Sequence, residues 1–299
     1  MITNADFLNR ILEKVLTAAD LTSLGLKLFP DKIPSKQIFK SEEKELAYIG
    51  VAHKKDPESD TLTIIKSVLN DFTPDFIFVE GFQNIKVAIS DLTRILDEKI
   101  QKYGEEEYKN RMVRMHGEAI YLILYALINK IDLDTIEGSK EEETHYLFSF
   151  GYSCNEIFLK YCLRTLSSFH RILTTGYCTE VNFQKHLKPT IELLQKCKIF
   201  NESTLEYSKF VELFKQFIGV DFDVADKVSY QSFTSAVIGI HRPSIRFNQQ
   251  SQKLAELRDR VAITKIYNAL KTHNKVLVVM GATHLVLQEK AIQLIFDDF

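Results

Sequence analysis

Two histidines follow short apolar runs with the same spacing, one at the end of GVAH (His53) and one at the end of GATH (His284). Two glutamates, Glu80 and Glu137, close further predicted strands, and each is followed by glycine. Neutral imidazoles with one or two carboxylates can bind a divalent cation and leave a position open for water. Without a metal, one imidazole can act as a general base that a carboxylate orients. The residues leave both chemistries open.

Two further charged residues are candidates for the same site. Glu118 lies in a strongly apolar segment, so we expect it either to face the site as a buried acid or to stand at a helix start. Arg258 precedes the last apolar run, where a guanidinium could bind a carboxylate or a substrate anion. Pairing within its own helix is the simpler explanation of its charge.

The elements that would position these residues begin with a βαβ pattern. Residues 46–52 and 75–79 are short apolar runs, and residues 58–70 carry apolar side chains at helical spacing. Ligands of open α/β sheets bind outside the carboxyl ends of the strands. The pattern therefore predicts His53 and Glu80 at one edge of a sheet.

The rest of the chain extends this pattern. Further strands are predicted at 131–136 and 275–280, and the predicted helices before and after them cover 84–103, 117–130, 249–272 and 285–295. Glycine after a strand, as in the two Gly-x-x-His segments, lets the chain bend closely. The prediction is an α/β fold with a parallel or mostly parallel sheet flanked by helices and a large helical insertion.

The predicted domain organisation is simple. Residues 1–45 form an N-terminal helical arm, and residues 46–299 form a single α/β domain. Within that domain, about 141–217 is helical throughout and rich in Phe and Tyr, as expected of an insertion or lid. We have no assignment for residues 219–248.

Composition narrows the class of protein. The 299 residues are 45% hydrophobic and carry a net charge of −2, which gives no reason to expect a nucleic-acid partner. The longest apolar run, 119–128, is too short to span a bilayer, and the N-terminus lacks the apolar core of a signal peptide. The four cysteines form no CxxC pair, which favours a reduced, cytoplasmic protein. Self-association stays open.

Several common catalytic motifs are missing from the sequence. It contains no HExxH, no phosphate-binding glycine loop, no GxSxG elbow and no GxGxxG fingerprint. The commonest nucleotide-binding and serine-hydrolase classes are therefore excluded as interpretations of the motifs.

Three stretches resemble the superfamily that contains TraB/PrgY-type proteins, Tiki metalloproteases, erythromycin esterases and ChaN-like haem-binding proteins. They are GVAH through PDFIFVEG (50–81), GEAIYLILYALINKIDLDTIEG (117–138) and LRDRVAITKIYNALKTHNKVLVVMGATHL (257–285). They cover about a third of the chain but span its sheet from end to end. The helical region 141–217 has no counterpart in the resemblance, and no transmembrane region of the TraB kind is present.

The resemblance implies an α/β core in which His53, Glu80 and His284 form the active constellation, with Arg258 in support. It implies a hydrolase of an ester or amide bond, acting on a small-molecule or peptide substrate with a His/Glu centre. A divalent Mn, Co, Zn or Fe ion held by the same three residues is the metal-dependent version. The alternatives are a non-enzymatic protein that binds haem or another small ligand, and a signalling or interaction module with an inactive site.

Overall fold

The computed structural model describes residues 4–24, 27, 30–81, 85–172, 178–200, 204–226 and 246–298. The chain divides into two compact units. The first consists of Met1–Gly138 and Arg258–Phe299, and the second of Ser139–Leu257. Every candidate site residue named above belongs to the first unit.

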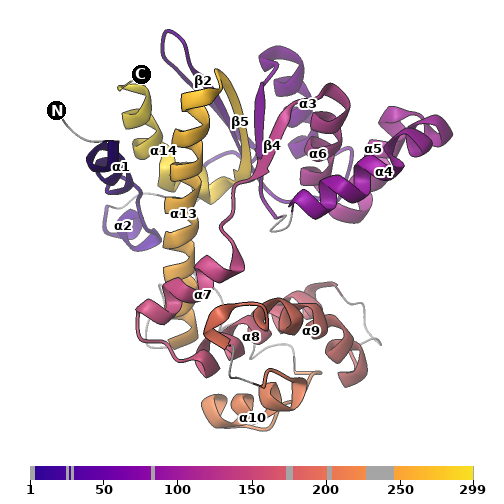
Figure 1. The fold of residues 1–299 in the computed structure, drawn as a ribbon, viewed down its shortest axis with the longest axis vertical. Coiled ribbons are helices and arrows are strands. Elements are labelled where there is room, and N and C mark those ends of the chain that lie inside the picture. Colours follow the sequence, from indigo (N-terminus) through magenta and orange to yellow (C-terminus); the bar gives the residue numbers. More distant parts are fainter. Residues whose placement is uncertain are drawn as a thin grey trace. The chain divides into compact units, whose positions relative to one another are not determined.

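Within the described residues, the first unit is built on a sheet of five strands in the order β1-β2-β5-β3-β4 (Figure 1). In that order the strands are Ser35–Lys40, Glu45–Val51, Lys275–Gly281, Phe76–Val79 and Asp132–Thr135. β1 runs antiparallel to β2, and the other three pairings are parallel. The predicted α/β fold with a mostly parallel sheet is confirmed.

The strand order contains one feature that matters for the site. β2 and β3 each pair with β5 along its length, so the last strand in the chain lies between two strands that precede it. The two strands of the βαβ pattern are therefore separated by one strand. As a result, the carboxyl ends of β2, β5 and β3 lie side by side.

One face of the sheet is covered by helices that follow β2 and β3 in sequence (Figure 1). These are α3 (Asp60–Phe72), α4 (Ile85–Tyr103), α5 (Glu105–His116) and α6 (Glu118–Asn129). The strands contribute every second residue to this core, for example Ala47, Ile49 and Val279. That alternation is what the period of two along a strand requires.

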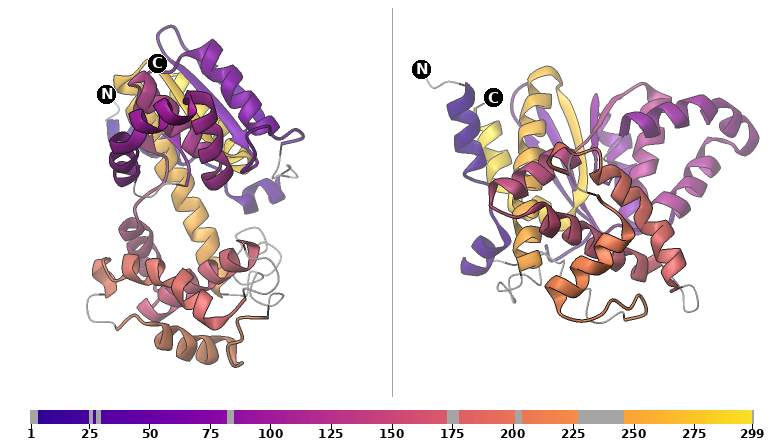
Figure 2. Two further views of the ribbon diagram at one scale, coloured as in Figure 1. Left: turned by 90° about the vertical axis from the view of Figure 1, so that its right-hand side faces the viewer. Right: turned by 60° about the horizontal axis from the view of Figure 1, so that its bottom comes forward.

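The other face is covered by helices from both ends of the chain (Figure 2). They are α1 (Asn4–Leu12), the part of α13 (Arg246–Thr272) that begins at Arg258, and α14 (Ala282–Phe296). The intervening strand residues, such as Tyr48, Val278 and Met280, fill this second core. A sheet buried on both faces explains why β2 and β5 read as continuous apolar runs.

The region predicted as a helical arm, residues 1–45, also supplies a strand. Besides α1 and α2 (Ala18–Ser23), it contains β1, the antiparallel edge of the sheet. Lys36 and Lys40 alternate with more buried residues along β1. Lysine on an edge strand discourages pairing with another chain, and it also weakens the apolar signal by which the strand could be recognised.

The second unit is helical, as the composition of 141–217 predicts. Its elements are α7 (Lys140–Ser149), α8 (Cys154–Ile172), α9 (Glu180–Leu194), the 3₁₀ turn η1 (Lys198–Phe200), α10 (Tyr207–Ile218) and the start of α13. Its core is rich in aromatic rings, among them Phe158, Phe183 and Phe210. Residues 227–245, which make up most of the unassigned segment 219–248, lie outside the described residues. Among the helices of the described ranges, none is long and apolar enough to cross a membrane.

Candidate active site

The side chains of His53, Glu80 and His284 converge on one glycine at the end of β5. A Cβ atom placed on Gly281 would lie 3.6 Å from His53 Nε2, 3.6 Å from Glu80 Oε2 and 3.5 Å from His284 Cδ2. The three residues follow β2, β3 and β5, which are the adjacent strands of the sheet. The strand order thus brings together side chains that are up to 231 residues apart in the numbering, as the difference between 53 and 284 shows.

At the glycines of the two Gly-x-x-His segments, the missing side chain matters more than the flexibility of the backbone. Gly281 has φ −51°, a conformation open to any residue. At Gly50, an added Cβ would lie 2.8 Å from Ser35 Oγ and 3.0 Å from the backbone of Ala282. The chain does turn at Gly281, from β5 into α14, but its backbone conformation there does not require glycine. Its missing side chain instead leaves the centre of the cluster open.

His53 lies two residues after the end of β2, between two carboxylates. Its Nδ1 is 2.6 Å from Glu118 Oε1, and its Nε2 is 3.5 Å from Glu80 Oε2. The hydrogen bond with Glu118 and the one with Glu80 raise the pKa of His53 from 6.5 to about 10. More than half of the His53 side chain (57%) remains exposed, so one side of the ring faces solvent.

Glu118 is both a helix start and a buried acid of the site. It is the first residue of α6, and its side chain is only 6% exposed. Gly117 precedes it with φ 87°, in the left-handed region that favours glycine. Besides contacting His53, the Glu118 carboxylate accepts a hydrogen bond from the backbone N–H of Lys54 at 3.1 Å. The helix start therefore holds the loop after β2 as well as the imidazole.

Glu80 is the carboxylate that links both halves of the site. Its Oε2 accepts the backbone N–H of Gly281 at 2.7 Å, and its Oε1 accepts Nη2 of Arg258 at 2.5 Å. Burial raises the pKa of Glu80, but the hydrogen bond with His53 and the charge of Arg258 outweigh it and hold that pKa well below its usual range. Glu80 is therefore a fixed negative charge.

Arg258 supports two strand-end carboxylates at once. The same Nη2 also donates to Glu137 Oε1 at 2.8 Å, so Glu137 joins the cluster through the guanidinium. Lys265, two turns further along α13, donates to the backbone carbonyl of Glu137 at 2.9 Å. Arg258 thus pairs with acids from β3 and β4, and pairing within its own helix is not needed to explain its charge.

His284 lies in the first turn of α14 and is paired with Asp259, which sequence reasoning missed. Its Nδ1 is 2.7 Å from Asp259 Oδ1, and its Nε2 is 4.0 Å from Glu80 Oε1. Asp259 is 1% exposed, and the His284 side chain is 12% exposed. The sequence offered one signal, an aspartate directly after the candidate Arg258 in the same predicted helix.

The types of side chain in the site would suit a divalent cation, but the positions of these side chains suit it less well. Two imidazole Nε2 atoms face Glu80, and each Nδ1 is held by a carboxylate, as in many metal sites. However, Arg258 already occupies Glu80 Oε1. Over the described ranges, no group of three or more His, Cys, Asp or Glu side chains is arranged to hold a metal ion. The Mn, Co, Zn or Fe site stays a prediction.

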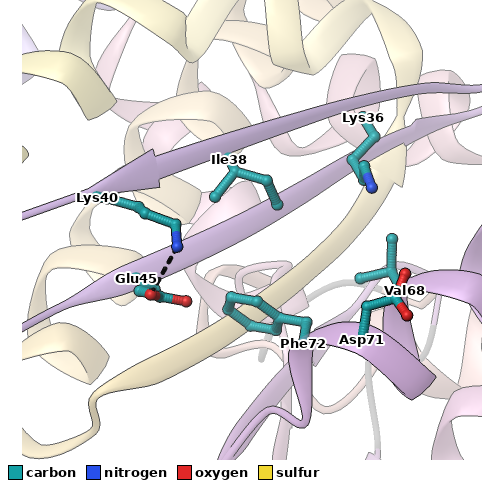
Figure 3. A pocket seen from close by; sticks show the side chains of 7 residues that line it. All are labelled: Lys36, Ile38, Lys40, Glu45, Val68, Asp71 and Phe72. Carbon is teal, nitrogen blue, oxygen red and sulfur yellow. Dashed lines mark hydrogen bonds and ion pairs between the residues drawn. The ribbon is translucent and has the colours of Figure 1, made fainter.

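A surface cavity of about 180 Å³ lies away from this cluster, between β1, the start of β2 and α3 (Figure 3). Its lining residues are Lys36, Ile38, Lys40, Glu45, Val68, Asp71 and Phe72. Two lysines and two acids balance its charge, and Lys40 is paired with Glu45 at 2.8 Å. The cavity contains none of the candidate site residues, so it gives no information on their chemistry.

No family model, curated protein or solved structure matches the chain. The resemblance to the TraB, Tiki, erythromycin esterase and ChaN superfamily therefore stays a prediction.

Proposed function

We propose that the first unit is a hydrolase of ester or amide bonds that activates water with its own side chains. One observation carries the proposal. His53 and His284 are each anchored through Nδ1 to a largely buried carboxylate, and both direct Nε2 toward Glu80. An imidazole that a carboxylate orients in this way is suited to proton transfer at its other nitrogen.

His284 is assigned the role of general base. A carboxylate only accepts hydrogen bonds, so the contact with Asp259 requires the proton of neutral His284 to lie on Nδ1. Nε2 then carries the lone pair. The 4.0 Å between Nε2 and Glu80 Oε1 is too long for a direct hydrogen bond and leaves Nε2 available to a water molecule.

His53 is assigned the role of general acid. Its two carboxylate neighbours raise its pKa to about 10, so the ring is protonated at neutral pH. More than half of its side chain is exposed, so a leaving group can approach the ring. A proton held by His53 and a lone pair on His284 Nε2 supply the acid and the base that hydrolysis needs.

The proposed reaction balances with these two groups alone. His284 Nε2 takes a proton from water, the hydroxide oxygen bonds to the carbonyl carbon, and a tetrahedral oxyanion forms. The bond from carbon to the alcohol or amine then breaks, and His53 gives its proton to that leaving group. Asp259 and Glu80 stabilise the His284 imidazolium, and transfer of its proton back to His53 through water restores the starting state.

The test is a panel of chromogenic esters and amides with wild type, His284→Ala and His53→Ala. His145→Ala is the matched control, because His145 is an exposed histidine of the second unit. We expect hydrolysis by wild type and the control, and its loss in His284→Ala on every substrate. In His53→Ala the loss should be largest on amides and on esters with poor leaving groups. These results should be the same with and without added Mn, Co, Zn or Fe. Hydrolysis that survives in His284→Ala would overturn the proposal.

The panel also separates the alternatives. If wild type hydrolyses nothing but binds haem with a Soret band that His53→Ala loses, the site is a ligand site. If wild type hydrolyses only with an added metal that both site variants fail to bind, the metal-dependent version replaces this one. If wild type neither hydrolyses a substrate nor binds haem, the signalling or interaction module is the remaining interpretation.

A further inference from the structure

A buried chain of hydrogen bonds extends from His284 into the core of the first unit. Asp259 Oδ1 accepts from His284 Nδ1 at 2.7 Å and from Gln288 Nε2 at 2.6 Å. Gln288 Oε1 in turn accepts from the Tyr48 hydroxyl at 3.1 Å. Gln288 and Tyr48 are fully buried, and Asp259 is nearly so. A neutral glutamine is costly to bury in an apolar core unless its hydrogen bonds are satisfied, so its contacts call for an explanation.

The chemistry of these groups gives the chain a fixed direction. Asp259 offers only acceptors, so the amide of Gln288 must turn its NH₂ toward it. With the amide reversed, Gln288 Oε1 would face a carboxylate oxygen at 2.6 Å, which is repulsive. Tyr48 fixes the same orientation from the other end because its hydroxyl donates to the amide oxygen.

Tyr48 has two acceptors within reach and one proton. Its hydroxyl lies 3.1 Å from Gln288 Oε1 and 3.4 Å from Met280 Sδ. A thioether is a weak acceptor, so the amide oxygen takes the proton. Burial raises the pKa of Tyr48 well above its usual value, and the phenol therefore keeps that proton to donate.

We propose that Gln288 and Tyr48 are positioning residues that set the tautomer of His284. The chain from Tyr48 through Gln288 holds Asp259 in the rotamer that accepts the Nδ1 proton, and this leaves the lone pair on Nε2. Gln288 lies one turn after His284 in α14, so one helix carries both the base and the group that holds its partner. The inference rests on the proposed function for its kinetic consequence, but the tautomer itself does not depend on hydrolysis.

The test measures the His284 side-chain nitrogens by long-range ¹H–¹⁵N NMR, with the resonance assigned from the His284→Ala spectrum. In wild type we expect the proton on Nδ1. Gln288→Leu removes the hydrogen bonds with Asp259 and Tyr48, and the weak contact with Met280 Sδ, at similar volume. It should give a mixture of tautomers. Tyr48→Phe removes only the hydroxyl and should give a smaller shift in the same direction. Val278→Ala is the control, because Val278 belongs to the same core but takes no part in the chain of hydrogen bonds.

Kinetics on the best ester substrate give the second readout. We expect kcat to fall about 10-fold in Gln288→Leu with KM unchanged, the lower end of the effect of outer hydrogen-bond partners. Val278→Ala should lose stability while keeping both its tautomer and its kcat. If Gln288→Leu does not fold, Tyr48→Phe carries the test.

The outcomes separate this inference from the proposed function. A His284 tautomer that is the same in wild type, Gln288→Leu and Tyr48→Phe overturns the positioning role, whatever the activity. A tautomer that changes as expected in a protein that hydrolyses no ester or amide supports the positioning role and overturns the proposed function. An equal change in Val278→Ala would assign the effect to general loosening of the core and would also overturn the inference.

Discussion

The two halves of the site begin from the same Gly-x-x-His spacing and end in different environments. His53 lies in the loop after β2, is more than half exposed, and meets Glu118 at the start of a neighbouring helix. His284 lies in the first turn of α14, is mostly buried, and meets Asp259 within a chain of buried hydrogen bonds. One carboxylate, Glu80, serves both.

The difference teaches that environment rather than motif assigns a role to each histidine. Two nearby carboxylates and solvent access suit His53 to hold a proton and release it to a leaving group. A single close carboxylate, fixed from behind, suits His284 to present a lone pair in a defined direction. Two histidines in identical environments would hold a proton equally well, so neither would be favoured as the acid or as the base.

The largest effect should come from removing the base. His284→Gln should lower kcat/KM about 10³-fold, because general base catalysis contributes about 10²- to 10⁴-fold. The measurement is steady-state hydrolysis of the best ester, with circular dichroism to verify folding. The assignment of the two halves breaks if His284→Gln loses less activity than His53→Gln.

The next effect sharpens the same comparison. His53→Gln should lower kcat/KM about 10²-fold on esters with poor leaving groups, near the lower end of the range for proton transfer. Esters with good leaving groups need little protonation, so the loss should shrink with them. A loss that does not depend on the leaving group would contradict the role of His53 as an acid.

Gly281 tests whether the space between the two halves is used. Gly281→Ala would place a methyl group about equally far from His53, Glu80 and His284, at ordinary contact distances. We expect kcat/KM to fall about 10-fold, since small displacements at a reacting centre are costly. The free energy of unfolding should be unchanged or raised by about 0.5 kcal/mol, because the backbone there suits alanine.

Gly50→Ala is the matched variant. Its Cβ would meet Ser35 Oγ at 2.8 Å and the Ala282 backbone at 3.0 Å, so it should lower stability. Chemical denaturation and kinetics of both variants provide the comparison. Equal stability losses in the two would show that Gly281 is a packing residue.

The smallest effect is the pH dependence of stability from the exposed half. The pKa of His53 is raised from 6.5 to about 10, so its contribution is complete below pH 6.5 and is lost as the pH rises through 10. Because the ring is largely exposed, solvent screening limits the loss to about 1 kcal/mol. Urea unfolding of wild type and His53→Gln at pH 6 and pH 10.5 measures it. The same pH dependence in both proteins would exclude His53 as its source.

Much of the fold could be predicted because its signals are local. The apolar runs of β2, β3 and β5, the alternating pattern of β4 and the helices between them follow from periodicity. The α/β class follows from their order. The edge strand β1 could not be predicted, since its exposed lysines dilute the apolar pattern. β1 is held by its pairing with β2, and residue propensities do not indicate which strands pair.

The candidate site was predictable in its residues and not in its connections. His53, Glu80 and His284 are polar groups at the ends of apolar runs, and that pattern is visible in the sequence. Asp259 and Gln288 carry no comparable signal, because a polar residue on a helix is buried or exposed according to its distant neighbours. The placement of β5 between β2 and β3 likewise depends on which strands pair, and the periodicity of the sequence does not indicate this.

The position of β5 also determines when the candidate site can form during synthesis. During synthesis on a ribosome, β2 and β3 emerge long before the strand that joins them, and more than a hundred residues of the helical unit come in between. To complete its sheet, the first unit must close a long loop, which costs conformational entropy. Contacts between residues so far apart in sequence are typical of slow folding. Any fragment that ends before Lys275 lacks both the joining strand and His284. Such a fragment therefore cannot form the candidate site.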